Sequence, residues 1–412
     1  MNGNKKKPLV PRLRFPEFRA EAGWGPEFGN MIFDQISNKD HSADLPVLAI
    51  TQEQGAIPRE MIDYHVSVTE KSLESYKVVE VGDFIISLRS FQGGIEFSRY
   101  RGICSPAYVI LRLRHGYSED YFRHYLKTDR FIAQMTKNLE GLRDGKMISY
   151  KQFSALALPI PPCDEQQKIA DCLSSLDDLI AAETQKLDTL KIHKKGLMQQ
   201  FFPREGETVP RLRFPEFRNL GEWKEKSISD FGEIITGSTP STAHPEFYGG
   251  GIPFVSPADI SDLRWVSDTK TTLSALGFEK TRPIKANSVL FVCIGSTIGK
   301  VTQNVRDCAT NQQINSVIPN SEHSGGFVYY ILSLNAERIA KLAGIQTVPI
   351  INKTQFSAVR LLVPESSEQD RIANCLSSLD DFIAAQSRKI DVLMIHKKGL
   401  MEQLFPVMSE VG

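Results

Sequence analysis

The chain has 412 residues and a mass of 46.2 kDa, which is more than one hydrophobic core usually organises, so we expect at least two domains. Hydrophobic residues make up 41% and charged residues 24%, a composition that excludes wholesale disorder. The 49 basic residues balance the 49 acidic residues, so net charge alone indicates no nucleic-acid partner. The chain lacks an apolar run of membrane-spanning length, an apolar signal core and any C-x-x-C pair, which favours a cytoplasmic protein with no metal site.

Two parts of the chain are repeated. Residues 10–19 and 209–218 share the ten letters VPRLRFPEFR, and a tryptophan follows each copy at the same distance. Residues 166–203 recur as residues 369–406 with 26 of 38 positions identical, whereas the segments between differ in sequence. We therefore expect a near-identical frame that carries two different inserts. Two-fold pseudosymmetry would also bring the C-terminus close to the start of the first copy.

The first insert has the pattern of a mixed α+β domain. Residues 82–88 and 107–114 are rich in β-branched and aromatic residues and predict strands. Residues 118–138 have helical spacing, with Ser118 as the N-cap. A Pro-rich extended segment, residues 156–162, ends the insert.

The second insert repeats this order with different residues. Residues 287–295 predict a strand, residues 325–344 predict a helix, and residues 360–365 form the extended exit. The shared order indicates one fold with two diverged surfaces.

The segment after each insert predicts a long helix, because its apolar residues fall on the a and d positions of a heptad. The main seam positions are Ile169, Leu173, Leu176, Ile180, Leu187 and Leu190 in the first copy and Ile372, Leu376, Leu379, Ile383, Ile390 and Leu393 in the second. Both seams break at equivalent polar residues, Glu183 with Gln386 and Lys194 with Lys397, which favours two helices that pack on each other in a fixed register. The alternative is two surface helices that each cover their own domain, although five heptads exceed a typical globular helix.

The ends and length of these helices also follow from the sequence. Gly196 and Gly399, with Pro203 and Pro406 beyond them, predict where the two helices stop. At 1.5 Å per residue each helix would be roughly 55 Å long, enough to hold two domains apart.

The sequence contains no recognisable catalytic motif. It has no H-E-x-x-H, G-x-S-x-G, Walker A or dinucleotide-binding string, and residues 295–302, GSTIGKVT, are one residue too short between the glycines for a phosphate loop. We therefore predict a chain that is not an enzyme, with no catalytic residue and no cofactor of its own.

Basic residues cluster inside the inserts, among side chains that form hydrogen bonds. Arginine pairs with guanine, and asparagine or glutamine with adenine, in the major groove of DNA. Such clusters also form solvated faces, and part of residues 311–315 also fits a buried structural role. The candidate DNA-binding residues are Arg89, Ser90, Gln92, Arg99, Arg101 and Lys146 in the first insert and Lys285, Ser296, Thr297, Lys300, Gln312 and Gln313 in the second.

Several strings resemble the specificity subunits of type I restriction–modification enzymes. They are the E-Q-x-x-I-A-x-x-L-S-S-L-D-D start of each helix, the LPIPP exit, and TGSTPS, YGG and GSTIGKV…NQQIN in the second insert. The resemblance implies an α+β fold in which two mixed α/β target-recognition domains are separated by an antiparallel coiled coil. The implied domains are residues 1–163 and 204–367, and the implied helices lie in residues 164–203 and 368–412. No recognition string of the first insert matches that family.

The resemblance also implies a function and partners. Each recognition domain would read one half of a gapped double-stranded DNA site, and the coiled coil would set the spacer and dock two methyltransferase subunits and the restriction subunits. S-adenosylmethionine, ATP and Mg would belong to those partners, in DNA methylation and phage defence. The alternative is a scaffold for protein partners that reads no DNA, which the near-neutral charge favours. Two divergent inserts on a nearly invariant frame count against a scaffold.

Overall fold

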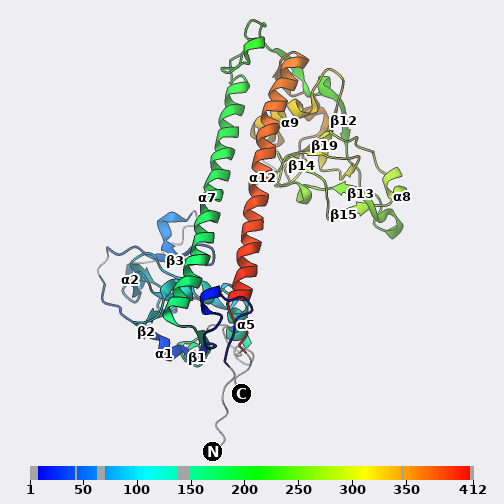
Figure 1. Ribbon diagram of the computed structural model, residues 1–412. Helices are drawn as coiled ribbons and strands as arrows, with labels where there is room; N and C mark the ends of the chain where they lie inside the picture. The colour runs from blue at the N-terminus through cyan, green and yellow to red at the C-terminus, as the bar shows by residue number, and fades with distance from the viewer. Residues whose placement is uncertain (1–7, 42–43, 63–69, 138–147, 345–347, 409–412) are drawn as a thin grey trace, which may run out of the picture. The chain divides into compact units, whose positions relative to one another are not determined.

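The computed structural model describes residues 8–41, 44–62, 70–137, 148–344 and 348–408, which fall into two compact units (Figure 1). Unit 1 comprises Met1–Ala182 and Ile390–Gly412, and unit 2 comprises Glu183–Lys389. Each unit contains one insert and a part of each of two 39-residue helices, α7 (Cys163–Phe201) and α12 (Ser366–Leu404). The predicted α+β tandem fold is confirmed.

Unit 1 is built on a four-stranded antiparallel sheet in the order β2-β9-β6-β7. Its strands are β1 (Gly25–Phe28), β2 (Phe33–Ile36), β3 (Leu48–Thr51), β4 (Gly55–Pro58), β5 (Lys77–Val79), β6 (Phe84–Ile86), β7 (Glu96–Phe97), β8 (Gly102–Cys104), β9 (Val109–Leu113) and β10 (Ala157–Ile160). Its shorter helices are α1 (Gly29–Ile32), α2 (Glu70–Leu73), α3 (Ser90–Gly93), α4 (Glu119–Tyr125), α5 (Asp129–Lys137) and α6 (Tyr150–Ser154). Phe33 lies at the centre of the core, in edge-to-face contact with Phe84, Phe122 and Phe153.

Unit 2 repeats this sheet with one more strand, in the order β12-β19-β16-β17-β14. Its strands are β11 (Lys224–Ser227), β12 (Gly232–Thr236), β13 (Tyr248–Val255), β14 (Trp265–Val266), β15 (Thr271–Leu273), β16 (Val289–Val292), β17 (Val301–Asn304), β18 (Ala309–Thr310), β19 (Ile314–Pro319) and β20 (Arg360–Val363). Its shorter helices are α8 (Ala275–Glu279), α9 (Gly325–Leu334), α10 (Ala336–Ala340) and α11 (Lys353–Ser357), and α9 lies between the sheet and α12 (Figure 1). The first four strands follow the order of unit 1, so the two inserts share one topology.

The strand predictions are confirmed, whereas both predicted insert helices are broken. β6, β9 and β16 lie inside the predicted strand segments, and Ser118 caps α4 by accepting a hydrogen bond from the backbone N–H of Tyr121 at 3.3 Å. The chain turns between α4 and α5 because the Thr128 hydroxyl accepts from the N–H of Phe131 and starts a new helix. In unit 2, Asn335 separates α9 from α10.

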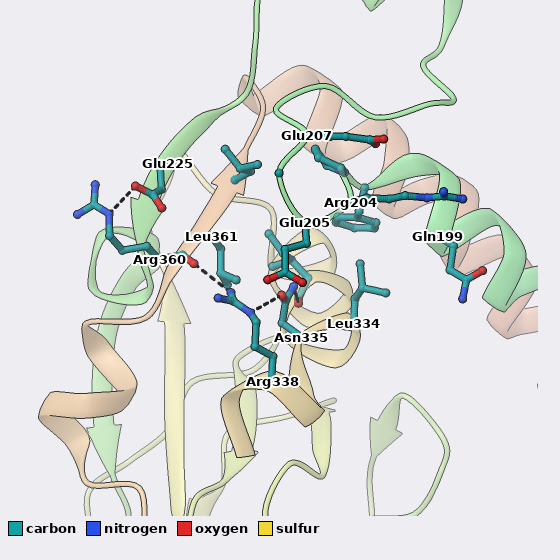
Figure 2. Close-up of a pocket in the computed structure, with 15 residues that line it drawn as sticks. Gln199, Arg204, Glu205, Glu207, Glu225, Leu334, Asn335, Arg338, Arg360 and Leu361 are labelled. Carbon is teal, nitrogen blue, oxygen red and sulfur yellow. Dashed lines mark hydrogen bonds and ion pairs between the residues drawn. The ribbon is translucent and has the colours of Figure 1, made fainter. Parts of the chain in front are cut away.

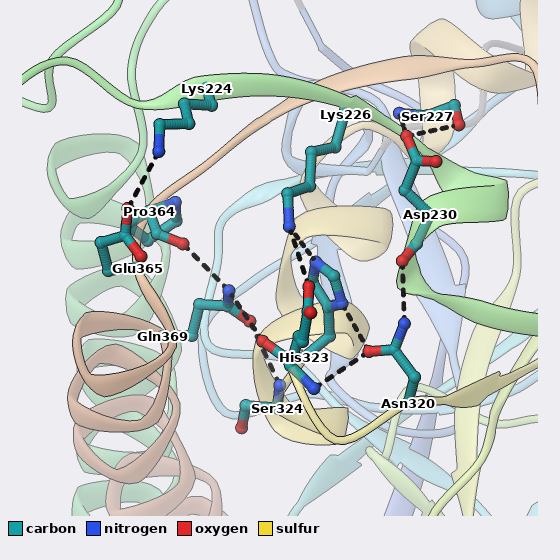
Figure 3. Close-up of polar contacts among 11 residues, drawn as sticks. Lys224, Lys226, Ser227, Asp230, Asn320, His323, Ser324, Pro364, Glu365 and Gln369 are labelled. Carbon is teal, nitrogen blue, oxygen red and sulfur yellow. Dashed lines mark hydrogen bonds and ion pairs between the residues drawn. The ribbon is translucent and has the colours of Figure 1, made fainter.

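The repeated frame segments make equivalent contacts in the two units. β1 pairs with β10 in unit 1, and β11 pairs with β20 in unit 2, both antiparallel. The Gln166 side chain accepts a hydrogen bond from the Ser118 N–H at 3.0 Å and so ties the start of α7 to α4. Gln369 does the same for Ser324 at the start of α9, at 3.1 Å, and donates to the carbonyl of Pro364 (Figure 3).

The two long helices pair in opposite directions within each unit. In unit 1, Ile169 and Leu173 near the start of α7 share one core with Leu404 at the end of α12. In unit 2, Phe201 at the end of α7 shares a core with Ile372 near the start of α12. Antiparallel pairing is therefore present in both units, and the ends of each helix also complete the domain cores.

Ion pairs and amide contacts occupy the polar breaks in the seam. Lys397 pairs with Asp177 in unit 1, and Lys194 pairs with Asp380 in unit 2, both at 2.5 Å. The Gln386 amide donates to the Glu183 side chain at 2.6 Å, so the two predicted breaks meet. These contacts confirm that the seam exceptions bring the helices together.

The described C-terminal residues meet the N-terminal repeat, as pseudosymmetry predicts. The Leu13 N–H donates to the carbonyl of Gln403, and the Leu212 N–H donates to that of Gln200, both at 3.0 Å. The prediction that the two long helices stop at Gly196 and Gly399 is wrong, because both glycines lie inside the helices. The helices end just before Pro203 and Pro406, as the prolines predict. A helical glycine lowers stability by about 1 kcal/mol but does not end a packed helix.

Candidate nucleic-acid interface

The strand order brings several long loops to one end of each sheet. In unit 1, Ile36 at the end of β2, Ile86 at the end of β6 and Val109 at the start of β9 lie side by side through the β9 register. The segments 37–41, 87–95 and 105–108 therefore leave the sheet at the same end. In unit 2 the equivalent segments are 237–247, 293–300 and 311–313. We call this the loop end of each unit.

In unit 1 the loop end carries Arg89 and Gln92, both exposed, on the turn around α3. Ser90 is on the same turn but only 1% exposed, because its hydroxyl accepts a hydrogen bond from the Ser87 N–H at 2.8 Å. The prediction of Ser90 as a DNA contact is therefore wrong; its hydroxyl shapes the turn.

Arg99 and Arg101 are exposed but lie beyond β7, at the opposite end of the sheet from Arg89. Arg101 forms an exposed ion pair with Glu80 at 3.1 Å. Lys146, the remaining candidate of the first insert, lies outside the described residues. The first insert thus divides its predicted arginines between two ends of one sheet.

In unit 2, five of the six candidates share the loop end. Ser296, Thr297 and Lys300 lie between β16 and β17, and Gln312 and Gln313 immediately precede β19. Gln313 is engaged within the loop, where its side-chain oxygen accepts from the Asn311 amide at 2.9 Å. The Lys300 ammonium group donates to the carbonyl of Ile260 at 2.9 Å, although the residue is exposed.

Lys285 does not belong to this group. It precedes β16 and forms an exposed ion pair with Asp307 at 3.2 Å, at the opposite end of the sheet. Arg101 of unit 1 lies at the same end of its sheet, but it follows β7, whereas Lys285 precedes β16. Both units therefore carry a paired cation away from the loop end.

Three residues at the loop ends were not identified from the sequence. The Gln52 amide donates to the carbonyl of Arg89 at 3.3 Å, and Tyr108 immediately precedes β9. In unit 2 the Thr239 hydroxyl donates to the Gln312 side-chain oxygen at 2.6 Å. Thr239 belongs to the TGSTPS string, which resembles the specificity-subunit family, so a sequence motif pointed to it. No such motif pointed to Gln52 or Tyr108.

Four of the predicted seam residues lie in domain cores. Ile169 and Ile372 are 1% exposed, and Leu173 and Leu376 are fully buried. These four side chains pack inside the units, and the predicted docking of partners on the helices stays a prediction.

A cavity in unit 2 lies away from the loop ends. It has a volume of about 610 Å³ and is lined by the end of α7, the segment that follows it, α9 and β20. Figure 2 shows Arg338 between Asn335 and the backbone of Arg360, while Arg360 turns toward Glu225 at 2.8 Å. None of the candidate DNA-binding residues lines this cavity.

Three of the cysteine thiols are held in the protonated form. Burial raises the pKa of Cys104, Cys293 and Cys308 to about 12. Within the ranges that the structure describes, no group of three or more His, Cys, Asp or Glu side chains is placed to hold a metal ion. None of the described helices carries an apolar stretch long enough to cross a bilayer.

Comparison with known proteins identifies the family. A profile described as the type I restriction modification DNA specificity domain matches residues 29–191 and 221–394, one copy in each repeat. The chain belongs to this family. It is a type I DNA specificity subunit, the non-catalytic component that gives such an enzyme its DNA sequence specificity, and not a scaffold that ignores DNA. As such it works with DNA and with the other subunits of a type I enzyme.

Relatives of this specificity subunit have distant sequences. The HindI specificity subunit of Haemophilus influenzae is 28% identical over 330 residues, covering 64% of this chain and 68% of the relative. The EcoR124I/EcoR124II specificity subunit of Escherichia coli is 29% identical over 249 residues, covering 58% and 59%.

Solved structures share the fold. The crystal structure of the type I restriction–modification S subunit from M. genitalium matches with a TM-score of 0.60 and 14% identity, covering 97% of this chain and 100% of that one. A chain from a structural study of complex assembly and conformational transition in the type I R-M system matches with a TM-score of 0.56 and 17% identity, covering 93% and 98%.

Proposed function

We propose that each unit of this specificity subunit reads one half of a bipartite, gapped DNA site through its loop end. The observation that carries the proposal is the repeat itself. One fold occurs twice on a nearly identical frame, and the inserts that form the two loop ends differ in sequence. A protein with two copies of one reading device and unlike surfaces suits a site with two unlike halves.

The proposed DNA contacts are the candidates at the loop ends that are exposed or, for Thr297, half-buried. Arg89 and Gln92 serve in unit 1, and Ser296, Thr297, Lys300 and Gln312 serve in unit 2, with Gln313 shaping the loop. Side chains on these loops read base edges, while phosphate contacts by cations set the register. The opposite ends of the two sheets carry Arg99, Arg101 and Lys285. In this proposal these cations make no base contact, and any contact they make with DNA is to its phosphate backbone.

The domain limits 1–163 and 204–367, with the helices between and after them, remain part of the proposal. In it the paired helices α7 and α12 set the spacer between the half-sites and carry two methyltransferase subunits, to which restriction subunits bind. Those partners hold S-adenosylmethionine, ATP and Mg, and methylation requires the methyltransferase to flip an adenine out of the duplex. Chromosomal DNA as substrate places the complex in the cytoplasm.

Co-expression with the methyltransferase subunit, followed by genome-wide mapping of methylated adenines, tests the proposal. We expect one motif with two fixed halves and a fixed gap, methylated on both strands. Exchange of the first insert alone should change one half and leave the other half and the gap as they were. An assembled, active complex that methylates a continuous motif, or no motif, would contradict the proposal.

A further inference from the structure

The two loop ends present different hydrogen-bonding groups, although their strands have the same order. The loop between β6 and β7 in unit 1 presents Arg89, whereas the equivalent loop between β16 and β17 in unit 2 presents the hydroxyl groups of Ser296 and Thr297. Unit 2 presents an amide, Gln312, from the neighbouring segment before β19. A guanidinium group and an amide prefer different base edges, so Arg89 and Gln312 suit different bases.

The backbone of Arg89 is held rigidly. Its N–H donates to the Ser87 hydroxyl at 3.2 Å, and its carbonyl accepts from the Gln92 N–H at 2.9 Å and from the Gln52 amide at 3.3 Å. The turn is closed by the Ser90 hydroxyl already described. A side chain on a fixed backbone loses less conformational freedom when it binds.

The guanidinium group of Arg89, by contrast, is exposed, and no carboxylate among the described residues pairs with it. The first acid after Arg89 in the chain, Glu96 at the start of β7, is 2% exposed and pairs with Lys127 at 2.5 Å, so it does not compete for Arg89. Burial raises the pKa of the Tyr108 hydroxyl, and the charges of Arg59 and Arg89 oppose that rise, which places Arg89 near the segment that precedes β9. An unpaired arginine therefore stands among the loops of the loop end.

The amide of Gln312 is also oriented and also exposed. Its oxygen accepts a hydrogen bond from the Thr239 hydroxyl at 2.6 Å, which fixes the plane of the amide and leaves one oxygen lone pair. No described residue accepts from its nitrogen. The neighbouring amides of Asn311 and Gln313 are bonded to each other, so Gln312 is the amide of this segment that faces a ligand.

We propose that Arg89 reads a guanine in the half-site bound by unit 1, and that Gln312 reads an adenine in the half-site bound by unit 2. The inference rests on the proposed function and adds the base chemistry of each half. Arginine donates two parallel hydrogen bonds to O6 and N7 of guanine, and glutamine accepts from N6 and donates to N7 of adenine. The complementary base of the same base pair does not offer either of these two-bond patterns, so each contact specifies one base.

The experiment is methylome mapping of variants in the co-expressed complex, on the host chromosome. Arg89→Gln should relax one guanine position of one half-site by about 5- to 150-fold, with the other half and the gap unchanged. Arg89→Lys keeps the charge and loses the planar fork, so it should relax the same position while the complex still methylates its sites. Gln312→Ala should relax one adenine position of the other half-site.

Arg101→Gln is the matched control, because Arg101 is an exposed arginine of the same sheet at its opposite end. We expect its motif to equal that of the wild type. If Arg89→Gln fails to assemble, Arg89→Lys decides the question. The assignment of Arg89 to a guanine is overturned if both Arg89 variants methylate the wild-type motif, or if the relaxed position is not a guanine. The proposed function survives that result as long as the wild-type motif is gapped. A wild-type complex without a gapped motif overturns both.

Discussion

Arg14 and Glu165 form a buried bidentate ion pair, with the guanidinium Nε and Nη2 each 2.7 Å from a carboxylate oxygen. Arg213 and Glu368 repeat this pair in unit 2 at the same distances. The arginine belongs to the repeated VPRLRFPEFR string and the glutamate to the first turn of the long helix. The pair therefore explains why these two distant parts of the frame are repeated together.

Removal of Arg14 should destabilise unit 1 strongly. Arg14→Ala leaves the Glu165 carboxylate buried without its cation, which lowers the free energy of unfolding by about 3–5 kcal/mol. Denaturant unfolding of the full chain measures the loss. Lys224→Ala is the control, because the Lys224–Glu365 pair is exposed, with side chains 76% and 68% accessible, and such pairs contribute about 1 kcal/mol at most. Equal losses for the two variants would contradict a structural role for Arg14.

The two frame tryptophans should differ in their response to the same substitution. The Trp24 indole N–H donates to Glu165 at 2.9 Å, whereas the Trp223 indole N–H is buried with no acceptor in the part of the chain that the structure describes. Both Trp→Phe variants lose similar packing, but only Trp24→Phe loses a hydrogen bond to a charged group. We expect Trp24→Phe to lower the free energy of unfolding by about 1.5–3 kcal/mol more than Trp223→Phe. Equal effects in denaturant unfolding would show that this hydrogen bond contributes nothing.

Periodicity predicted the helices well and the individual contacts poorly. The heptad pattern identified the seam because local spacing alone determines which face of a helix is apolar. The partner of Arg14 is 151 residues away, and no local pattern encodes that distance. The insert helices broke where Thr128 and Asn335 take part in local hydrogen bonds that compete with a continuing helix.

The candidate interface was predicted by residue type rather than by position. Sequence neighbours such as Arg89 and Arg99 look like one basic cluster, but strand β7 lies between them and carries them to opposite ends of the sheet. Ser90 has the right chemistry and the wrong orientation, because its hydroxyl is used by Ser87. Only the strand order, which depends on long-range pairing, shows which loops share an end.

The polar break at Glu183 and Gln386 should fix the register of the two long helices but lower the free energy of unfolding relative to an apolar seam. The Gln386 amide donates to Glu183 at 2.6 Å, and Gln386 is 6% exposed. Glu183→Leu alone removes the side-chain acceptor and leaves that amide only the backbone carbonyl of residue 183, at 2.9 Å, so it should lower the free energy of unfolding by about 0.5–1.5 kcal/mol. The double variant Glu183→Leu with Gln386→Leu should raise it to the wild-type value or above, since apolar seam residues pack without desolvating polar groups. Denaturant unfolding of the three proteins decides; a double variant as unstable as the single one would contradict the argument.

His124 should make unit 1 less stable in acid. Burial, with the charges of Lys397 and Arg123, lowers the pKa of His124 to about 3, and the unfolded value is about 6.5. As pH falls below 6.5 the unfolded chain takes up a proton that the folded chain refuses, so stability falls by up to about 1.4 kcal/mol per pH unit. His124→Gln should remove this part of the slope between pH 7 and pH 4.5 in denaturant unfolding. If the free energy of unfolding depends on pH equally in the wild type and in His124→Gln, the proton taken up on unfolding binds a group other than His124.

Lengthening both long helices by one heptad should change the gap of the DNA site and nothing else. Glu183 faces Gln386, so one insertion beside each residue leaves the Asp177–Lys397 and Lys194–Asp380 pairs intact on either side. A heptad keeps the seam in phase and adds about 10 Å of helix, which equals about three base pairs at 3.4 Å each. We expect methylome mapping of the co-expressed complex to show both half-sites unchanged and the gap longer by about three base pairs. Insertion in α7 alone is the control, since it puts the two seams out of register and should reduce assembly. A changed half-site in the double insertion would show that the helices do more than set the gap.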